Sequence, residues 1–231
     1  GYLYIDTKQI EKSIEIFEKY LNSKNKDFLA EAQIRLGYLY IEKNQIDKAI
    51  NIFEKYVTGD KKEHFLEIKL RLAYLYLERN QIFLAIALFE EVRQSPNYQQ
   101  NKELLKTLLV LYRENVSEEK YLKFLTEVRS DQKLDGNIRK EFQTHLIKAY
   151  FQQKKCEKLL LELKDRPGYI QNIKNMDPEE WQNVMFLQGS CLMNTKKWTD
   201  ARNIFRHTRE STKYREQSIQ MMLEAQRQLE D

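Results

Sequence analysis

The side chains that most often carry out chemistry are few and scattered in this sequence. It contains two cysteines, Cys156 and Cys191, and three histidines, His64, His145 and His207. Neither cysteine belongs to a CxxC pair, and no group has the ligand spacing of a zinc site. Nucleophile, phosphate-loop and metalloprotease motifs are also missing. We therefore expect no catalytic residues, no metal site and no cofactor, and we interpret both cysteines as small core residues.

Carboxylates are numerous, but their spacing is that of helix surfaces. Glu18, Glu54 and Glu90 recur every 36 residues, and each directly follows a phenylalanine. General acid–base catalysis needs groups that reach one substrate together, which a regular surface row does not provide. We expect these glutamates to be solvated, and we disfavour an enzyme.

The charge balance disfavours two further classes of protein. The 39 basic residues exceed the 35 acidic ones by only 4, so the basic footprint of a nucleic-acid-binding protein is missing. No apolar stretch approaches the roughly 18 residues that a membrane span requires. A mild basic cluster lies near the C-terminus, and we interpret it as an ordinary charged helix surface: Lys196, Lys197, Arg202, Arg206, Arg209, Lys213 and Arg215.

The elements that hold these side chains are predicted to be helices. Only 6 glycines and 3 prolines occur in 231 residues, which disfavours a β-sandwich or barrel with its many turns. Residues 1–21, 37–57 and 73–93 are copies of one pattern, and the first two agree at 14 of 21 positions. Each copy has apolar residues at helical spacing, a short polar turn and a second apolar stripe. Such a turn predicts an antiparallel helix pair.

This pattern resembles the tetratricopeptide repeat. The family motif has a Gly or Ala, an aromatic residue, an Ala and a Phe at set spacing. The resemblance covers roughly residues 1–209, is weakest over 94–165, and implies an all-α, right-handed superhelical solenoid of about six helix pairs. The residues that carry it are Gly37, Tyr40, Ala49 and Phe53, then Ala73, Tyr76, Ala85 and Phe89, and finally Gly189, Leu192, Ala201 and Phe205.

The turn-forming residues between the apolar stripes predict how the chain is organised. Residues 1–165 would hold five repeats, of which 1–21 is a truncated first repeat and 94–165 is degenerate. Residues 166–177 would be an inserted connector, and 178–231 a sixth pair and a capping helix. The cap would bury an apolar stripe that includes Ile219, Met222, Leu223 and Leu229 and leave a polar outer face. Because the chain begins inside a repeat, we also expect an upstream segment.

The resemblance further implies a concave groove lined by the first helix of each pair. Three tyrosines 36 residues apart would form a ladder in it, with glutamates along one edge. Tyrosine offers a large contact area at a small entropic cost, so a partner helix or an extended peptide with basic residues would suit this surface. In the alternative, the tyrosines pack against the neighbouring helix or against a chain segment folded back into the groove. The expected partner-binding residues are Tyr2, Glu31, Ile34, Tyr38, Ile41, Glu67, Leu70, Tyr74, Leu77 and Lys106.

We therefore predict a non-catalytic scaffold or adaptor that binds a protein or peptide. The alternative is the peptide-sensing receptor domain of a bacterial regulator. Residues 27–57 also resemble bacterial envelope proteins of this family, such as the Tol–Pal coordinator and outer-membrane-assembly lipoproteins. That resemblance favours a periplasmic or envelope location over the cytoplasm and leaves the partner and the oligomeric state open.

Overall fold

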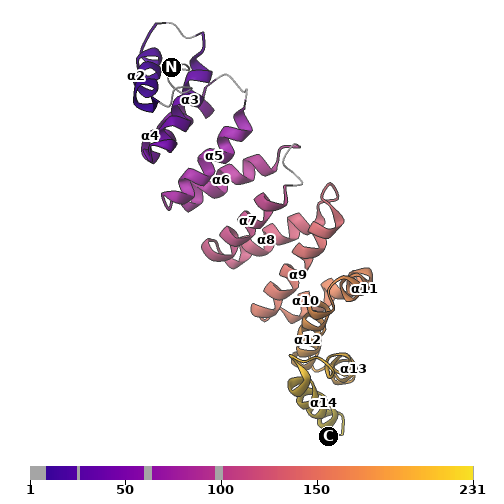
Figure 1. Ribbon diagram of the computed structural model, residues 1–231. Helices are drawn as coiled ribbons and strands as arrows, with labels where there is room; N and C mark the ends of the chain where they lie inside the picture. The colour runs from indigo at the N-terminus through magenta and orange to yellow at the C-terminus, as the bar shows by residue number, and fades with distance from the viewer. Residues whose placement is uncertain (1–8, 25–26, 60–63, 97–100, 231) are drawn as a thin grey trace. The chain divides into compact units, whose positions relative to one another are not determined.

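The architecture comes from a computed structural model that describes residues 9–24, 27–59, 64–96 and 101–230. Over these residues it contains thirteen α-helices and no strand, so the predicted all-α class is confirmed (Figure 1). The chain divides into two compact units, residues 1–116 and 117–231, each of which is described by itself. Tyr2 and the expected segment before residue 1 lie outside the described residues.

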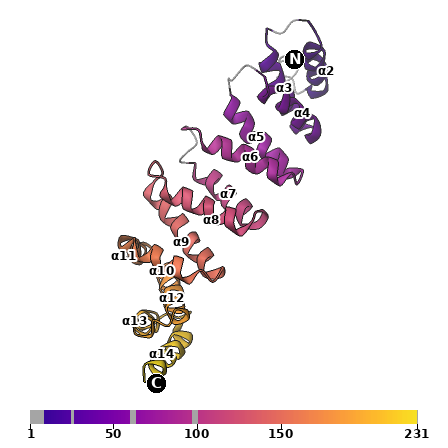
Figure 2. The same cartoon turned by 180° about the vertical axis from the view of Figure 1, so that it is seen from behind.

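The first unit consists of regular helix pairs. Helix α3 packs against α4, and α5 packs against α6. The two helices of each pair lie side by side both in Figure 1 and in the opposite view of Figure 2. The described helices are α2 (Ile10–Leu21), α3 (Leu29–Glu42), α4 (Ile46–Val57), α5 (Phe65–Glu78), α6 (Ile82–Arg93) and α7 (Lys102–Asn115).

The second unit has less regular helices. Helix α8 packs on α9, α9 is followed by α10 in a hairpin, α12 pairs with α13, and α14 packs on α13. The described helices are α8 (Glu118–Ser130), α9 (Gly136–Gln152), α10 (Cys156–Lys164), α11 (Pro167–Met176), α12 (Pro178–Asn194), α13 (Trp198–Thr208) and α14 (Arg215–Glu230).

One turn closes the hairpins of both units. Asn44 adopts a left-handed conformation (φ 54°), and the following Gln45 N–H donates to the Tyr40 carbonyl at 2.8 Å. These two features end a helix in the Schellman manner and satisfy its last carbonyls. The same positive φ recurs between the helices of the other hairpins, at Asn80, Lys154 and Lys196.

Within a pair, the two helices meet where a small residue faces a phenylalanine. A Cβ atom added at Gly37 would lie 2.2 Å from the Phe53 ring, and one at Gly189 would lie 2.8 Å from the Phe205 ring. Both rings are fully buried. The small residue of the motif therefore makes room for its own phenylalanine, in the regular copies and in the last one.

Tyrosines link successive repeats of the first unit. The Tyr40 hydroxyl donates to Glu18 at 2.5 Å, and the Tyr76 hydroxyl donates to Glu54 at 2.6 Å. Burial, with the neighbouring carboxylate, raises the pKa of both phenols. The expectation that Glu18 and Glu54 are merely solvated was wrong, because each accepts a hydrogen bond from the tyrosine 22 residues later. Glu90 instead accepts two hydrogen bonds from Arg93, at 2.8 and 2.6 Å.

The segment interpreted as an inserted connector contains a helix, α11. Its Tyr169 and Ile173 are buried in a cluster with Val184 of α12. The Tyr169 hydroxyl also shares a 2.6 Å hydrogen bond with Thr144 of α9. Helix α12 then begins at the predicted boundary, residue 178, with Pro178 in its first turn and the Asp177 carboxylate accepting from the Glu180 N–H at 2.9 Å. The insertion thus adds to the core.

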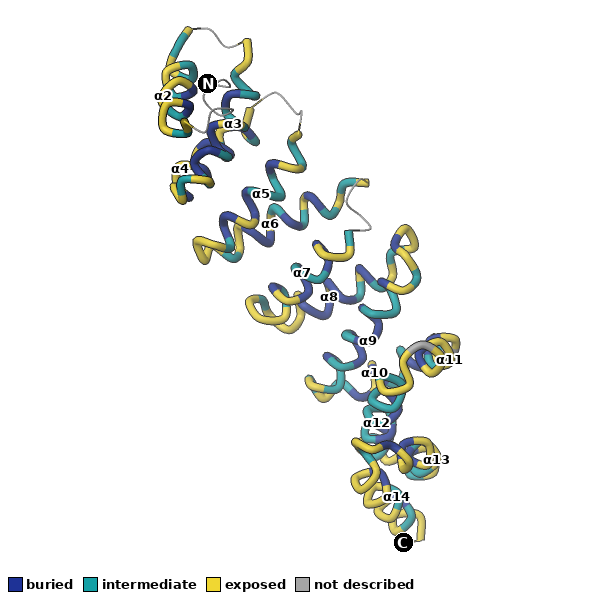
Figure 3. The backbone as a smooth tube through the Cα atoms, in the orientation of Figure 1, coloured by how far each residue is buried: buried dark blue, intermediate teal, exposed yellow. Residues whose placement is uncertain are grey.

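The last helix exists, but its predicted buried face was only partly right: Met222 packs against the cluster that contains Phe205, whereas Ile219, Leu223 and Leu229 are exposed. Ser218 and Ala225 are fully buried, whereas Leu223 is 57% exposed and most of the helix surface is open (Figure 3). The Ser218 hydroxyl shares a 2.8 Å hydrogen bond with Thr208 of α13. Small side chains permit this close approach, and most of the larger apolar residues of α14 face outward. Its exposed apolar residues are Ile219, Met221, Leu223 and Leu229.

Candidate functional site

The two cysteines are bonded to each other. Cys156 begins α10 and Cys191 lies in α12, and their sulfur atoms form a 2.12 Å disulfide across 35 residues of sequence. Both residues are buried, as expected, but the bond between them was not predicted. No free thiol is present among the cysteines. The signal that would have found the bond is the stacking of one hairpin on the next, which brings these two helices together.

Nothing in the described part of the chain assembles metal-binding chemistry. Among its His, Cys, Asp and Glu side chains, no group of three or more is arranged to hold a metal ion. His64 contacts Glu67 at 3.3 Å, and His207 lies edge-on to Trp181. None of the described helices has the length and apolar character needed to cross a membrane.

The predicted groove residues lie on the first helices of the first unit. They occur on α3, α5 and α7 at spacings of three and four, which places those of one helix on one side of it. We call this set the first-helix face and include Val110, which occupies the tyrosine slot on α7. Its described members are Glu31, Ile34, Tyr38, Ile41, Glu67, Leu70, Tyr74, Leu77, Lys106 and Val110.

Tyr38 connects two helices of this face. Its ring lies edge-on to Phe53, with centroids 5.6 Å apart. Its hydroxyl donates to the Glu67 carboxylate of α5 at 3.3 Å. Burial and the Glu67 charge raise the pKa of the Tyr38 phenol. The structure therefore brings Tyr38 and Glu67 together, and the packing alternative accounts for part of the role of Tyr38.

Tyr74 is more open than Tyr38. Its ring lies edge-on to Phe89 at 5.1 Å, but 40% of the residue is exposed. Val110 is 41% exposed. Because Phe89 is fully buried, Tyr74 is held on a rigid base while its outer surface faces solvent.

Acidic groups accompany the tyrosines. The Glu67 side chain is 58% exposed and that of Glu103 is 82% exposed. Glu31 pairs with Arg35 at 2.9 Å on α3, and Lys106 approaches Glu103 at 3.9 Å on α7. Lys106 thus contacts its own helix. The aliphatic members Ile34, Ile41, Leu70 and Leu77 are half-buried.

The sequence of the first repeats matches a known family. The model of the tetratricopeptide repeat matches residues 1–27 and 30–62. These residues amount to about a quarter of the chain, and no curated protein matches the sequence.

Several solved structures share the helical architecture at low identity. YrrB, described as a TPR protein with an unusual peptide-binding site, is 13% identical with a TM-score of 0.48, over 93% of this chain and 99% of YrrB. The P58(IPK) TPR domain is 13% identical with a TM-score of 0.42, over 98% of this chain and 63% of that one. The TPR2AB domain of yeast Sti1, in its pHSP90 complex, is 11% identical with a TM-score of 0.39, over 98% and 95%. Similarities this low do not indicate what the present chain binds.

Proposed function

We propose that this protein is a non-catalytic scaffold that binds a peptide or helix of another protein on the first-helix face. Tetratricopeptide repeats are generally protein-interaction modules, and residues 1–27 and 30–62 match the model of that family. The observation that carries the proposal is Tyr74, a large aromatic residue that is 40% exposed yet fixed against the buried Phe89. A rigid, partly exposed tyrosine contributes contact area without losing much entropy on binding.

The charges on this face suit a partner with basic residues. The Glu67 and Glu103 carboxylates are largely exposed and recur at the repeat spacing. A basic side chain every few residues along a bound peptide would meet them, and complementary charges mainly accelerate and orient association. The apolar part of the partner would lie over Tyr74, Leu70 and Val110.

The test is affinity capture from lysate and membrane fractions of the source organism, with the parent chain and a Tyr38→Ala/Tyr74→Ala variant. We expect the captured partner to be lost or weakened roughly 30-fold, because a central tyrosine contributes about 2 kcal/mol or more at an interface. Circular-dichroism melts of the two proteins establish whether the variant is folded. A partner retained equally by the folded variant would contradict the proposal.

A matched control removes apolar surface from a second helix. Phe83 and Leu84 of α6 are 70% and 51% exposed, so Phe83→Ala/Leu84→Ala deletes a comparable exposed area. We expect this variant to keep the partner. Loss of the partner in the control alone would assign the interface to the second helices.

The Cys156–Cys191 disulfide gives information on the cellular compartment of the protein. Buried disulfides persist where the environment is oxidising and are rare in reducing cytosol. The Cys156–Cys191 bond therefore supports an envelope or periplasmic location for this scaffold. Alkylation of the protein as isolated from its source, before and after reduction, tests this. Two thiols that react without reduction would argue for the cytoplasm.

A further inference from the structure

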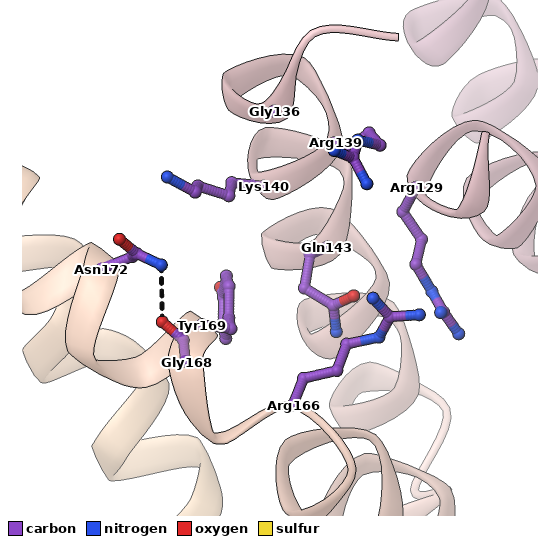
Figure 4. A pocket seen from close by; sticks show the side chains of 9 residues that line it. All are labelled: Arg129, Gly136, Arg139, Lys140, Gln143, Arg166, Gly168, Tyr169 and Asn172. Atoms are coloured by element: carbon purple, nitrogen blue, oxygen red, sulfur yellow. Dashed lines mark hydrogen bonds between the residues drawn. The ribbon is translucent and has the colours of Figure 1, made fainter. Parts of the chain in front are cut away.

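A cavity in the second unit has the character of an anion-binding site. It has a volume of about 260 Å³ and lies among α8, α9 and α11, and none of its lining residues belongs to the first-helix face. Figure 4 shows the lining side chains, in which Arg129, Gln143 and Arg166 point toward one another. The lining consists of Arg129, Gly136, Arg139, Lys140, Gln143, Arg166, Gly168, Tyr169 and Asn172.

The lining is basic and contains no acidic residue. Four of its members are arginines or lysines. Glu162 is not among the lining residues but is shared by two of them, since it accepts from Arg129 at 2.8 Å and from Arg166 at 3.1 Å. The adjoining cavity, which also touches Lys140, differs because acidic residues line it: Glu141, Asp177 and Glu180.

Several donors in this cavity have no partner among the described residues. The Nε atoms of Arg129 and Arg139 and the Nε2 atom of Gln143 are buried and make no hydrogen bond there. Gln143 is only 3% exposed. Buried polar groups normally have partners, because desolvating them without one is unfavourable. All three of these atoms are N–H donors, so the missing partner is an acceptor.

Two further features favour a negative charge. Helix α11 begins at the cavity, with Gly168 in its first turn, and no side chain caps its N-terminus. The first N–H groups of a helix, together with its dipole, attract anions. Burial lowers the pKa of Arg129, and the neighbouring Arg166 lowers it further, while Glu162 raises it; a bound anion would act in the same direction as Glu162.

We propose that this cavity binds a phosphate monoester group. A carboxylate has two oxygens, whereas a phosphate presents three strong acceptors and a charge near −2 to the arginines, the lysine and the amide. The Tyr169 hydroxyl is already engaged with Thr144, so the binding donors are all nitrogen. The phosphate could be carried by a phosphorylated side chain of a protein or by a small phosphorylated metabolite.

The test is calorimetric titration at constant ionic strength with inorganic phosphate, a phosphoserine peptide and glycerol phosphate. Arg139→Gln removes one cation, and Asn172→Asp places a carboxylate at the rim of the cavity. The Asn172 side chain is exposed, and among the described residues its hydrogen bond is to the Gly168 carbonyl, at 2.7 Å. We therefore expect the Asn172→Asp variant to fold. We expect each substitution to weaken the affinity for phosphate at least tenfold. The tighter of the two esters identifies the source of the group.

Arg209→Gln is the matched control. It removes one positive charge from the same unit, and Arg209 is 54% exposed and paired with Glu210 outside the cavity. Its phosphate affinity should equal that of the parent. The proposal is overturned if no phosphate compound binds up to roughly 10 mM. Equal weakening by Arg209→Gln would also overturn it, because binding would then follow net charge alone.

Discussion

The two units hold their repeats together in different ways. In the first, a tyrosine of one repeat bonds a glutamate of the preceding one, and the contact recurs as Tyr40–Glu18 and Tyr76–Glu54. In the second, the corresponding aromatic position at Tyr150 is preceded 22 residues earlier by Val128, which cannot accept that bond. A disulfide and the additional helix α11 join the helices there instead. Regular sequence is therefore one route to a stacked array, and contacts unique to one place are another.

The largest effect on stability should come from the contact between a glycine and a buried phenylalanine, which both units share. We expect Phe53→Ala and Phe205→Ala each to reduce the free energy of unfolding by about 3–5 kcal/mol. Both rings are fully buried and face a glycine, so no neighbouring side chain fills the space they leave. Hydrogen exchange should show lost protection in residues 29–57 for the first variant and in 178–208 for the second.

Phe83→Ala provides the reference for these two variants. Phe83 is 70% exposed, and its truncation should change stability by no more than about 0.5 kcal/mol. If Phe53→Ala proved as mild as Phe83→Ala, the small-residue and phenylalanine contact would not be the core of the pair. A large difference between Phe53→Ala and Phe205→Ala would show that the shared motif contributes unequally.

The next effect is confined to the second unit. Reduction of Cys156–Cys191 should lower the free energy of unfolding by about 2–4 kcal/mol, since the bond closes a loop of 35 residues. The measurement is a thermal melt with and without reductant. A Cys156→Ala/Cys191→Ala variant should be destabilised already and insensitive to reductant. Equal sensitivity in that variant would attribute the change to the reductant itself.

Features that repeat were predictable from the sequence, and unique ones were not. The hairpins follow from an apolar spacing that recurs in each copy of the repeat, for example at Tyr40 and Tyr76. Each copy therefore supports the prediction of a helix pair independently. The disulfide and the basic cavity occur once, and their members are separated in sequence. The basic residues at 196–215 are close together in sequence and so form a visible pattern, whereas Arg129, Arg139 and Arg166 are far apart in sequence and meet only in the folded chain.

The candidate interaction face was predictable only as a set of positions. Residues of one helix at spacings of three and four share a side whatever the packing, which gave the first-helix face. Their partners were not predictable, because Tyr38 donates to Glu67 on another helix. The buried face of α14 was predicted only in part for a related reason: the apolar stripe was the stronger pattern, but the small residues Ser218 and Ala225 form the contact together with Met222.

A smaller effect distinguishes the tyrosine contacts of the two units. Tyr76→Phe removes a hydrogen bond to the Glu54 carboxylate and should cost about 1 kcal/mol, below the usual range for charged partners because Glu54 is partly exposed. Tyr150→Phe is the matched change and should cost less than about 0.5 kcal/mol. Urea unfolding of both variants measures the difference. Equal values would mean that the Tyr–Glu bond does not stabilise the first unit.

The smallest effect on stability at neutral pH comes from the titration of the Tyr40 and Tyr76 hydroxyls. This effect grows as the pH rises. The folded chain raises the pKa of Tyr40 and Tyr76 by burial and by the neighbouring glutamates. Below the ordinary tyrosine pKa of about 10, both the folded and the unfolded states keep the proton, so stability is insensitive to it. Above that pH the unfolded chain loses the proton first, and stability falls as pH rises toward the folded-state pKa. Tyr76→Phe should therefore make the alkaline decline shallower, in urea melts between pH 8 and about 11. Tyr169 of the second unit also has a raised pKa, mainly through burial, so part of the decline should persist in this variant. An unchanged slope would mean that the Tyr76 proton is bound no more tightly in the folded first unit than in the unfolded chain.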